Sequence, residues 1–169
     1  RCWIFAGTNC LRPAFVKAFN LDKGAELSQN YLYFFHLLEQ ANYFLTKVEE
    51  TKDLPIGDRL VDHILSKPRE DGGQWHMFVS LVNKWGVVPQ DAFPETTHSQ
   101  NTAGLKWVLD WYLRRLAVKV RNNEKYNRAD VMNEVYLLLV KFLGRPPTTF
   151  SWEYLDKDKK FHRTEEMTP

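Results

Sequence analysis

The sequence lacks the features that define several protein classes. It has no long hydrophobic run: the longest unbroken apolar stretch is Val135 to Val140, whereas a transmembrane helix needs about 20 such residues. Glycine and proline are sparse, with 8 of each among 169 residues, and hydrophobic residues make up 44%. This composition excludes collagen and disordered chains and is typical of one globular domain. The chain has no internal repeat or low-complexity tract.

Cysteine is rare as well, with only Cys2 and Cys10. On one helix, eight residues separate the two by about 12 Å, which exceeds the reach of a disulfide. There is no Asn-x-Ser/Thr sequon, and the chain begins at Arg1 without a signal-peptide pattern. We therefore expect a reducing compartment, the cytosol. Because residue 1 is Arg rather than Met, we also expect the chain to be a piece of a longer protein.

An excess of one charge is also missing. The 23 Lys and Arg residues nearly balance 21 Asp and Glu, which leaves a net charge of +2. Such a balance does not by itself imply nucleic acid, which would need a clustered basic face. One candidate segment lies between residues 106 and 128, and its ordinary interpretation is a solvated helix face. Its basic residues are Lys106, Arg114, Arg115, Lys119, Arg121, Lys125 and Arg128.

Apolar residues recur at helical spacing along most of the chain. Pro13 should kink or interrupt the first helix. Ser28 and Asp58 should cap the second and third helices, and Gly86 and Gly144 should end the fourth and the last. In chain order, we expect helices over residues 3–19, 28–47, 58–65, 74–85, 105–122 and 128–143 or 130–143.

The remaining segments predict loops and a hairpin. Residues 87–104 contain Pro89 and Pro94 with Thr, Ser and Asn, and predict an irregular connection. Residues 149–154 alternate as a strand does, and residues 160–163 can return as a second strand after the Asp/Lys turn. The expected fold class is therefore α+β, mainly helical with a C-terminal β-hairpin.

Cys2 is the strongest candidate for chemistry. It lies at the start of a predicted helix, where unpaired N–H groups and the helix dipole favour an anion. The thiolate is the nucleophilic form of cysteine, so this placement suits covalent catalysis. The alternative is a small buried hydrophobe. For Cys10, in mid-helix among apolar neighbours, only this structural role is expected.

The loop Asp71, Gly72 and Gly73, followed by Gln74 and Trp75, is the second candidate. Two glycines allow another backbone to approach closely, and their N–H and C=O groups can pair with an extended peptide. A loop that simply leads into a helix is the alternative. The five histidines lack the spacing of metal ligands, so we expect no metal and no cofactor. Asp156-x-Asp158 lacks the rest of a calcium loop.

Several segments resemble the papain-like cysteine peptidases. Arg-Cys-Trp-Ile-Phe at residues 1–5 is similar to their nucleophile segment. Papain has Gly-Ser or Gly-Ala before Cys-Trp; Arg at this position is similar to the bleomycin hydrolase and aminopeptidase C branch. Further segments resemble blocks of that branch in the same order: ELSQNYL at 26–32, DGGQW at 71–75, KWGVVP at 84–89, FPE at 93–95, GRPP at 144–147 and FSWEYLDKD at 150–158.

The resemblance implies a papain-like fold. Residues 1–95 would form the helical half with the nucleophile helix, 96–147 a helical insertion, and 148–169 the start of the β part. It also implies an aminopeptidase of peptides and related amides, including bleomycin, that assembles as a cytosolic hexamer. The implied nucleophile is Cys2, and the implied substrate-binding residues are Gly72, Gly73, Gln74 and Trp75.

The same resemblance places the remaining catalytic groups outside this chain. The oxyanion glutamine would precede Arg1, and the catalytic His and Asn would follow later. His162 lies near the papain-like interval from Cys2, but no Asn-Ser-Trp-Gly-like segment follows it, so we reject it. The other histidines, His36, His63, His76 and His98, are expected to be structural or surface residues.

We therefore expect this chain alone to be inactive. A competing hypothesis from a different class is a non-catalytic helical interaction or nucleic-acid-binding module that uses the basic segment 106–128. Binding that falls steeply with salt and survives loss of the Cys2 thiol would support it. A degenerate copy of a peptidase gene is a third hypothesis.

Overall fold

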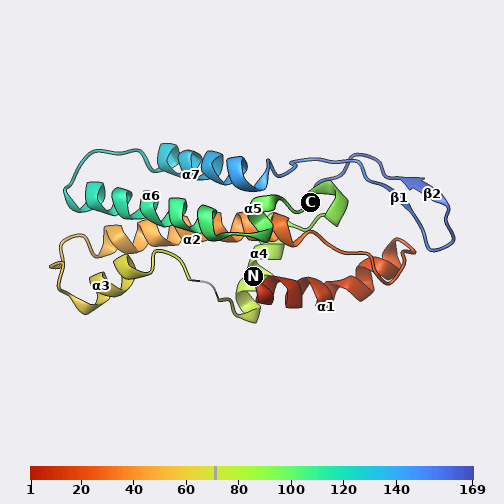
Figure 1. Ribbon diagram of the computed structural model, residues 1–169, viewed down its shortest axis with the longest axis horizontal. Helices are drawn as coiled ribbons and strands as arrows, with labels where there is room; N and C mark the ends of the chain where they lie inside the picture. Colours follow the sequence, from red (N-terminus) through yellow and green to blue (C-terminus); the bar gives the residue numbers. More distant parts are fainter. Residues whose placement is uncertain (71) are drawn as a thin grey trace. The chain divides into compact units, whose positions relative to one another are not determined.

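The structure is a computed structural model that describes residues 1–70 and 72–169, so Asp71 of the predicted loop lies outside the described residues. The described chain is mainly helical, and its last two regular elements form a small antiparallel sheet (Figure 1). The helices are α1 (Cys2–Ala18), α2 (Gln29–Glu50), α3 (Arg59–Ser66), α4 (Trp75–Trp85), the 3₁₀ turn η1 (Gln90–Ala92), α5 (Thr97–Gln100), α6 (Ala103–Arg121) and α7 (Arg128–Leu143), and the strands are β1 (Glu153–Leu155) and β2 (Phe161–Arg163).

The chain divides into two compact units. The first comprises Arg1–Phe35, Gly72–Thr96 and Arg145–Pro169, and the second comprises His36–Asp71 and Thr97–Gly144. Helix α2 passes from one unit into the other without a break. Both units are therefore built from segments that are far apart in the sequence.

In the first unit, α1 packs against α4. The contact is close at Gly7, where an added Cβ would lie 2.4 Å from the Phe78 ring. Ile4, on the same helix, is completely buried, and Phe78 is 2% exposed. Because a side chain at Gly7 would displace the aromatic ring, glycine is the residue that fits this contact.

The beginning of α2 is fixed by the segment that follows α4. Ser28 caps the helix as predicted, because its Oγ accepts a hydrogen bond from the Tyr31 N–H at 3.1 Å. The same hydroxyl donates to the carbonyl of Phe93, and the Ser28 N–H donates to the carbonyl of Val88 at 2.8 Å. The chain between Val88 and Phe93 is thereby held against the first turn of α2.

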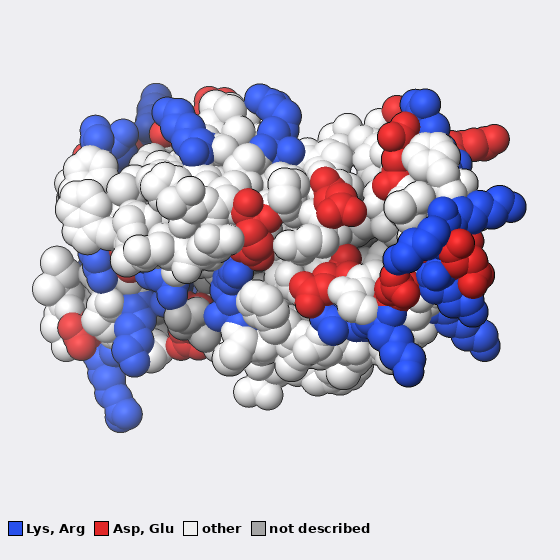
Figure 2. Space-filling view, turned by 45° about the vertical axis from the view of Figure 1, so that its right-hand side comes forward, with Lys and Arg blue, Asp and Glu red and all other residues white. Residues whose placement is uncertain are grey.

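The hairpin is held on the C-terminal end of α1. Strands β1 and β2 pair antiparallel, with Tyr154 opposite His162. Trp152, just before β1, is buried and stacks on Phe15 with ring centroids 5.6 Å apart, and Phe19 meets it edge-on at 5.3 Å. Figure 2 shows acidic and basic side chains side by side on the part of the surface that comes forward on the right.

The second unit is a packed set of helices in which α6 lies against α7. One side of α6 is buried, because its four leucines and its last valine recur at intervals of three and four: Leu105, Leu109, Leu113, Leu116 and Val120. In α7, Val131, Val135 and Leu139 are buried, while Leu138 and Phe142 are half-buried. Gly144 ends α7 with a φ of 92°, a conformation that favours glycine.

The structure corrects two expectations: an interruption of the first helix at Pro13, and a wholly irregular segment at residues 87–104. The chain does not break at Pro13, because α1 continues through it to Ala18. Pro13 lies on the exposed face, where the carbonyl it leaves unpaired can meet water. Residues 87–104 are not wholly irregular, since they contain η1, α5 and the start of α6. Among residues 1–70 and 72–169, no helix is both long and apolar enough to cross a lipid bilayer.

Candidate functional site

Cys2 is the first residue of α1, and its thiol is free and exposed. The turn is closed by the carbonyl of Arg1, which accepts hydrogen bonds from the N–H groups of Ile4 at 2.9 Å and Phe5 at 3.3 Å. The N–H of Cys2 itself belongs to the first turn, where backbone donors have no partner inside the helix. Cys2 is thus an accessible thiol beside the positive end of a 17-residue helix dipole, rather than a buried hydrophobe.

The glycine pair lies at the same turn of α1. A Cβ added to Gly73 would lie 2.4 Å from the indole of Trp3, the neighbour of Cys2. Gly72 has the opposite surroundings, because a Cβ there would meet none of the described residues within 4 Å. The structure therefore brings Cys2 and the glycine pair together, and leaves open space at Gly72 where an extended peptide could approach.

Gln74 and Trp75 continue from the glycine pair into α4. Gln74 precedes the helix, and its carbonyl accepts a hydrogen bond from the Met77 N–H at 3.0 Å. Trp75 is 63% exposed and stacks on Phe78 with ring centroids 5.7 Å apart. Since Phe78 packs on α1, one face of the Trp75 indole is covered by the Phe78 ring, and the exposed part of the indole offers an apolar surface.

Cys10 does not have the buried position expected for it. Its thiol is free and exposed, and it shares the exposed face of α1 with Ala6, Pro13 and Lys17. These residues recur at intervals of three and four, which places them on one side of the helix. The apolar neighbours of Cys10 in the sequence lie on the other sides.

His162 is held by the hairpin, far from Cys2. Its Nε2 lies 2.8 Å from Oδ2 of Asp156, and its ring stacks on Tyr154 at 5.1 Å. The hairpin contacts the residues that follow the C-terminus of α1, where Asn20 Nδ2 donates a hydrogen bond to the carboxylate of Asp158 at 3.2 Å. Because α1 is 17 residues long, it spans about 25 Å. The two side chains therefore lie at opposite ends of one helix, which supports the rejection of His162 as the catalytic base.

The carboxylate of Asp156 is the electrostatic centre of the hairpin. The hydrogen bond with His162 and the backbone N–H groups of Lys160 and Asp158 lower the pKa of Asp156 to about 2. Its side chain is 7% exposed. This is a carboxylate that stabilises a turn by accepting hydrogen bonds, as Asp commonly does in tight loops.

The other histidines have varied surroundings. His36 is 5% exposed and His98 packs edge-on against Phe142 at 4.9 Å. His63 lies on the surface, 3.9 Å from Glu70, and His76 is exposed in the first turn of α4. Within the described part of the chain, no three His, Cys, Asp or Glu side chains gather as metal ligands would.

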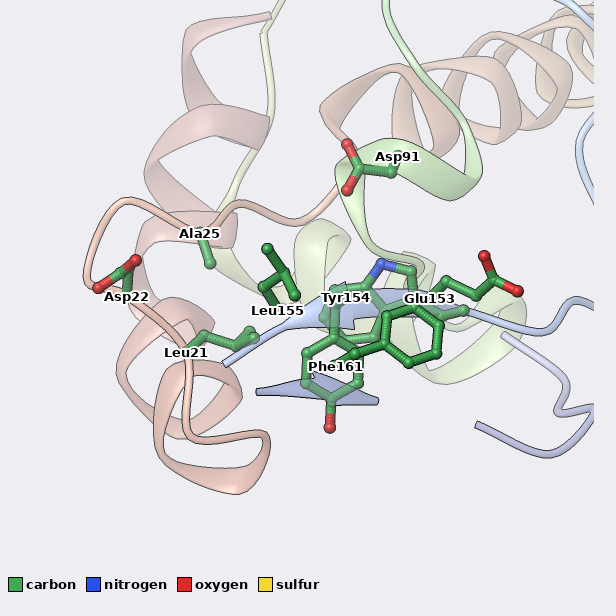
Figure 3. A pocket seen from close by; sticks show the side chains of 9 residues that line it. Leu21, Asp22, Ala25, Asp91, Glu153, Tyr154, Leu155 and Phe161 are labelled. Atoms are coloured by element: carbon green, nitrogen blue, oxygen red, sulfur yellow. The ribbon is translucent and has the colours of Figure 1, made fainter. Parts of the chain in front are cut away.

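A pocket of about 450 Å³ lies beside the hairpin rather than beside Cys2. Leu21, Leu155 and Phe161 form part of its apolar centre, and the carboxylates of Asp22 and Asp91 lie at its edge (Figure 3). Asp22 is already paired with Lys159, 3.3 Å away. Since the pocket is at the C-terminal end of α1, a molecule bound there would not reach the thiol.

Two arginines of the basic segment 106–128 donate hydrogen bonds to backbone carbonyls inside their own unit. Arg114 donates to the carbonyls of Leu65 and Ser66, both at 3.0 Å. Arg121 donates to the carbonyls of Thr51 and Leu54. Such arginines supply hydrogen-bond donors to carbonyls at helix and loop ends, which favours a structural role for them.

The sequence alone did not predict one ion pair at the site. Arg1 donates through Nη1 and Nη2 to the carboxylate of Glu95, with three distances of 3.1 Å. The two residues are 94 positions apart, so no local spacing could indicate the contact. The only signals in the sequence are the unusual Arg before Cys2 and the FPE segment that resembles a block of the branch.

Comparisons with known proteins agree with these observations. A family model described as the Peptidase C1-like family matches residues 1–169. The chain is 43% identical to aminopeptidase C of Listeria monocytogenes and 39% identical to bleomycin hydrolase of Gallus gallus. In each case all of this chain is covered, but only 40% and 39% of the relative.

A solved structure is also similar. The crystal structure of PepW from Lactobacillus rhamnosis HN001 superposes with a TM-score of 0.91 at 39% sequence identity. The match covers 99% of this chain and 40% of that chain. The chain thus spans about two fifths of the length of the relatives it matches.

Proposed function

Because the chain belongs to the peptidase C1-like family, whose fold is papain-like, we propose that the full-length protein is a cysteine aminopeptidase. It would hydrolyse N-terminal amide bonds of peptides and related amides, as the names of the relatives suggest. The observation that carries the proposal is the exposed thiol of Cys2 at the first turn of α1, with the glycine pair beside Trp3.

In the proposed mechanism, the thiolate of Cys2 attacks the carbonyl carbon of the first peptide bond. The oxyanion is stabilised by the N–H of Cys2 and by a glutamine outside this chain. A histidine outside this chain protonates the leaving amine, which breaks the C–N bond and leaves a thioester on Sγ. Water, deprotonated by the same histidine, then releases the acid and restores the thiol.

The substrate backbone would lie along Gly72 and Gly73. Open space at Gly72 leaves room for an extended chain, and backbone N–H and C=O groups there can pair with it as an added strand does. Gln74 and the exposed indole of Trp75 would contact the side chain of the substrate. No cofactor is required for this chemistry.

We further propose that the full-length protein acts in the cytosol as a homohexamer, and that the 169-residue chain alone is inactive. The resemblance to the bleomycin hydrolase and aminopeptidase C branch supports both statements. Sedimentation of the full-length protein measures the assembly, and a dimer or monomer at working concentration would contradict the hexamer.

Alkylation with iodoacetamide tests the role of Cys2 in the full-length protein. Both thiols are exposed, so accessibility does not distinguish them and Cys10 is a matched control. Near neutral pH, Cys2 should react much faster than Cys10, because only Cys2 lies at the positive end of the helix. Loss of peptidase activity should follow the modification of Cys2. Equal slow labelling of the two thiols would refute the catalytic role.

The alternative remains a helical binding module built on the segment 106–128. The single observation in its favour is that Arg115, Lys119 and Lys125 line a hollow of about 370 Å³ between α6 and α7. Asp130 and Glu134 line the same hollow. Carboxylates there would repel phosphate, so we favour the peptidase.

A further inference from the structure

The side chain of Arg1 is held from three directions. Its guanidinium faces the carboxylate of Glu95 with N–O distances of 3.1 Å. The rings of Phe5 and Tyr33 each have their centroid 5.2 Å from the guanidinium carbon. The two charged side chains are only 14% and 15% exposed. A planar group held by a forked ion pair and two aromatic rings has little freedom to move.

Arg1 also begins the helix that carries Cys2. Its carbonyl accepts the first hydrogen bonds of α1, from Ile4 and Phe5. The peptide bond between Arg1 and Cys2 contains the N–H that the proposed mechanism uses for the oxyanion. An anchor on the Arg1 side chain therefore acts on the backbone directly before the reacting thiol.

Glu95 is presented from a segment that is itself fixed. The carbonyl of the preceding residue, Pro94, accepts a hydrogen bond from Asn30 Nδ2 at 2.8 Å. One position earlier, the carbonyl of Phe93 accepts from the hydroxyl of Ser28. Both donors belong to the beginning of α2 and are buried. The carboxylate thus links the start of α1 to the start of α2.

We propose that Arg1 and Glu95 are positioning residues that fix the first turn of α1, and with it the thiol and N–H of Cys2. This inference rests on the proposed function, because it concerns the geometry of that reaction. Neither side chain needs to touch the substrate. Displacement of a reacting group by about 1 Å can cost up to about 100-fold in rate, so loosening this anchor should lower kcat rather than weaken binding.

The test compares full-length variants with a peptide amide as substrate. Arg1→Gln and Glu95→Gln should each lower kcat by about 10- to 100-fold, with KM within about twofold of wild type. The double variant should lose no more than either single variant, because both act through one contact. The matched control is Arg12→Gln, which removes another Arg–Glu pair of α1, with Glu26 at 2.7 Å, and should leave kcat unchanged.

The kcat values of the Arg1 and Glu95 variants test the positioning role, and the activity of Cys2→Ala tests the proposed function. Unchanged kcat in both single variants, with or without a lower melting temperature, would overturn the positioning role. Losses that multiply in the double variant would overturn it as well. Should Arg1→Gln fail to fold, Arg1→Lys keeps the charge without the fork and should still lower kcat. Activity that survives Cys2→Ala would refute the proposed function itself, whereas an inactive Cys2→Ala with unaffected Arg1 and Glu95 variants would refute only this inference.

Discussion

Gly72 and Gly73 are adjacent residues with opposite steric surroundings. At Gly73 a Cβ would lie 2.4 Å from the Trp3 indole, whereas at Gly72 no atom of residues 1–70 or 72–169 would lie within 4 Å of it. We expect Gly73→Ala to destabilise the full-length protein by about 1–3 kcal/mol, because the large ring must move. Gly72→Ala should change stability by less than about 0.5 kcal/mol. Urea unfolding of the two variants measures the difference.

The same pair of variants also separates support from substrate binding. Gly73→Ala displaces Trp3, the neighbour of Cys2, and should lower both stability and kcat. Gly72→Ala fills the open side where the substrate backbone would lie, and should raise KM without affecting stability. Equal stability of the two variants would contradict the packing of Gly73 on Trp3.

Among the structural elements, the hairpin depends most clearly on one ionised group. The pKa of Asp156 is lowered to about 2 by His162 and by backbone N–H groups, from an ordinary value of 3.8. A carboxylate whose pKa is lower in the folded state adds stability above its unfolded pKa and loses it as pH falls through the folded pKa. The contribution of Asp156 is therefore complete above about pH 4 and lost towards pH 2.

Asp156→Asn tests this contribution. The variant should melt at a lower temperature than wild type at pH 7, and the difference should shrink as the pH falls from 4 to 2. Glu153→Gln in β1 is the control, since its pair with Arg163 at 3.6 Å is exposed on both sides and should contribute little. A difference that stays constant down to pH 2.5 would show that charge is not what Asp156 contributes.

The elements also show which structure local sequence can predict. The sequence predicts the caps Ser28 and Asp58, because capping depends on one side chain and the N–H two or three residues ahead. Residues 87–104 contain two prolines, which obscured the short α5 and the start of α6. The sequence does not predict the exposure of Cys10, because burial depends on which face of α1 is covered by distant segments and not on the adjacent residues.

At the scale of the molecule, the sequence motifs identified the candidate site better than they identified its support. Cys2 and the glycine pair were recognisable because the chemistry constrains residue types within short segments. The anchor between Arg1 and Glu95 joins residues 94 positions apart, and only the folded chain reveals it. The predicted division at residues 96 and 148 concerns the whole peptidase fold and remains a prediction.

The second unit is also held by an arginine of the basic segment. Arg128, at the start of α7, donates to Glu49 at 2.7 Å and to Thr46 at 2.6 Å, and also to the carbonyl and side chain of Asn42. The three residues that accept these hydrogen bonds lie on α2. The same Glu49 accepts a hydrogen bond from the hydroxyl of Tyr126. Burial of the Tyr126 hydroxyl, together with the Glu49 carboxylate, raises the pKa of Tyr126 to about 12. The positive charge of Arg128 thus serves to join two helices.

Arg128→Met and Lys119→Met remove one positive charge each and separate the two functions considered for this segment. Arg128→Met should destabilise the full-length protein by about 1–2 kcal/mol, since it leaves Glu49 without a guanidinium partner and the pair is one-third exposed. Because Lys119 is exposed on α6, Lys119→Met should lower the free energy of unfolding by less than about 0.5 kcal/mol.

A nucleic-acid site would instead make the two substitutions alike, each reducing the salt dependence of binding by about one charge. Urea unfolding measures the stability of each variant, and DNA titration at low salt measures its binding. If the two variants were equally stable and both bound DNA more weakly, with salt-sensitive binding, the result would favour the binding module over the peptidase.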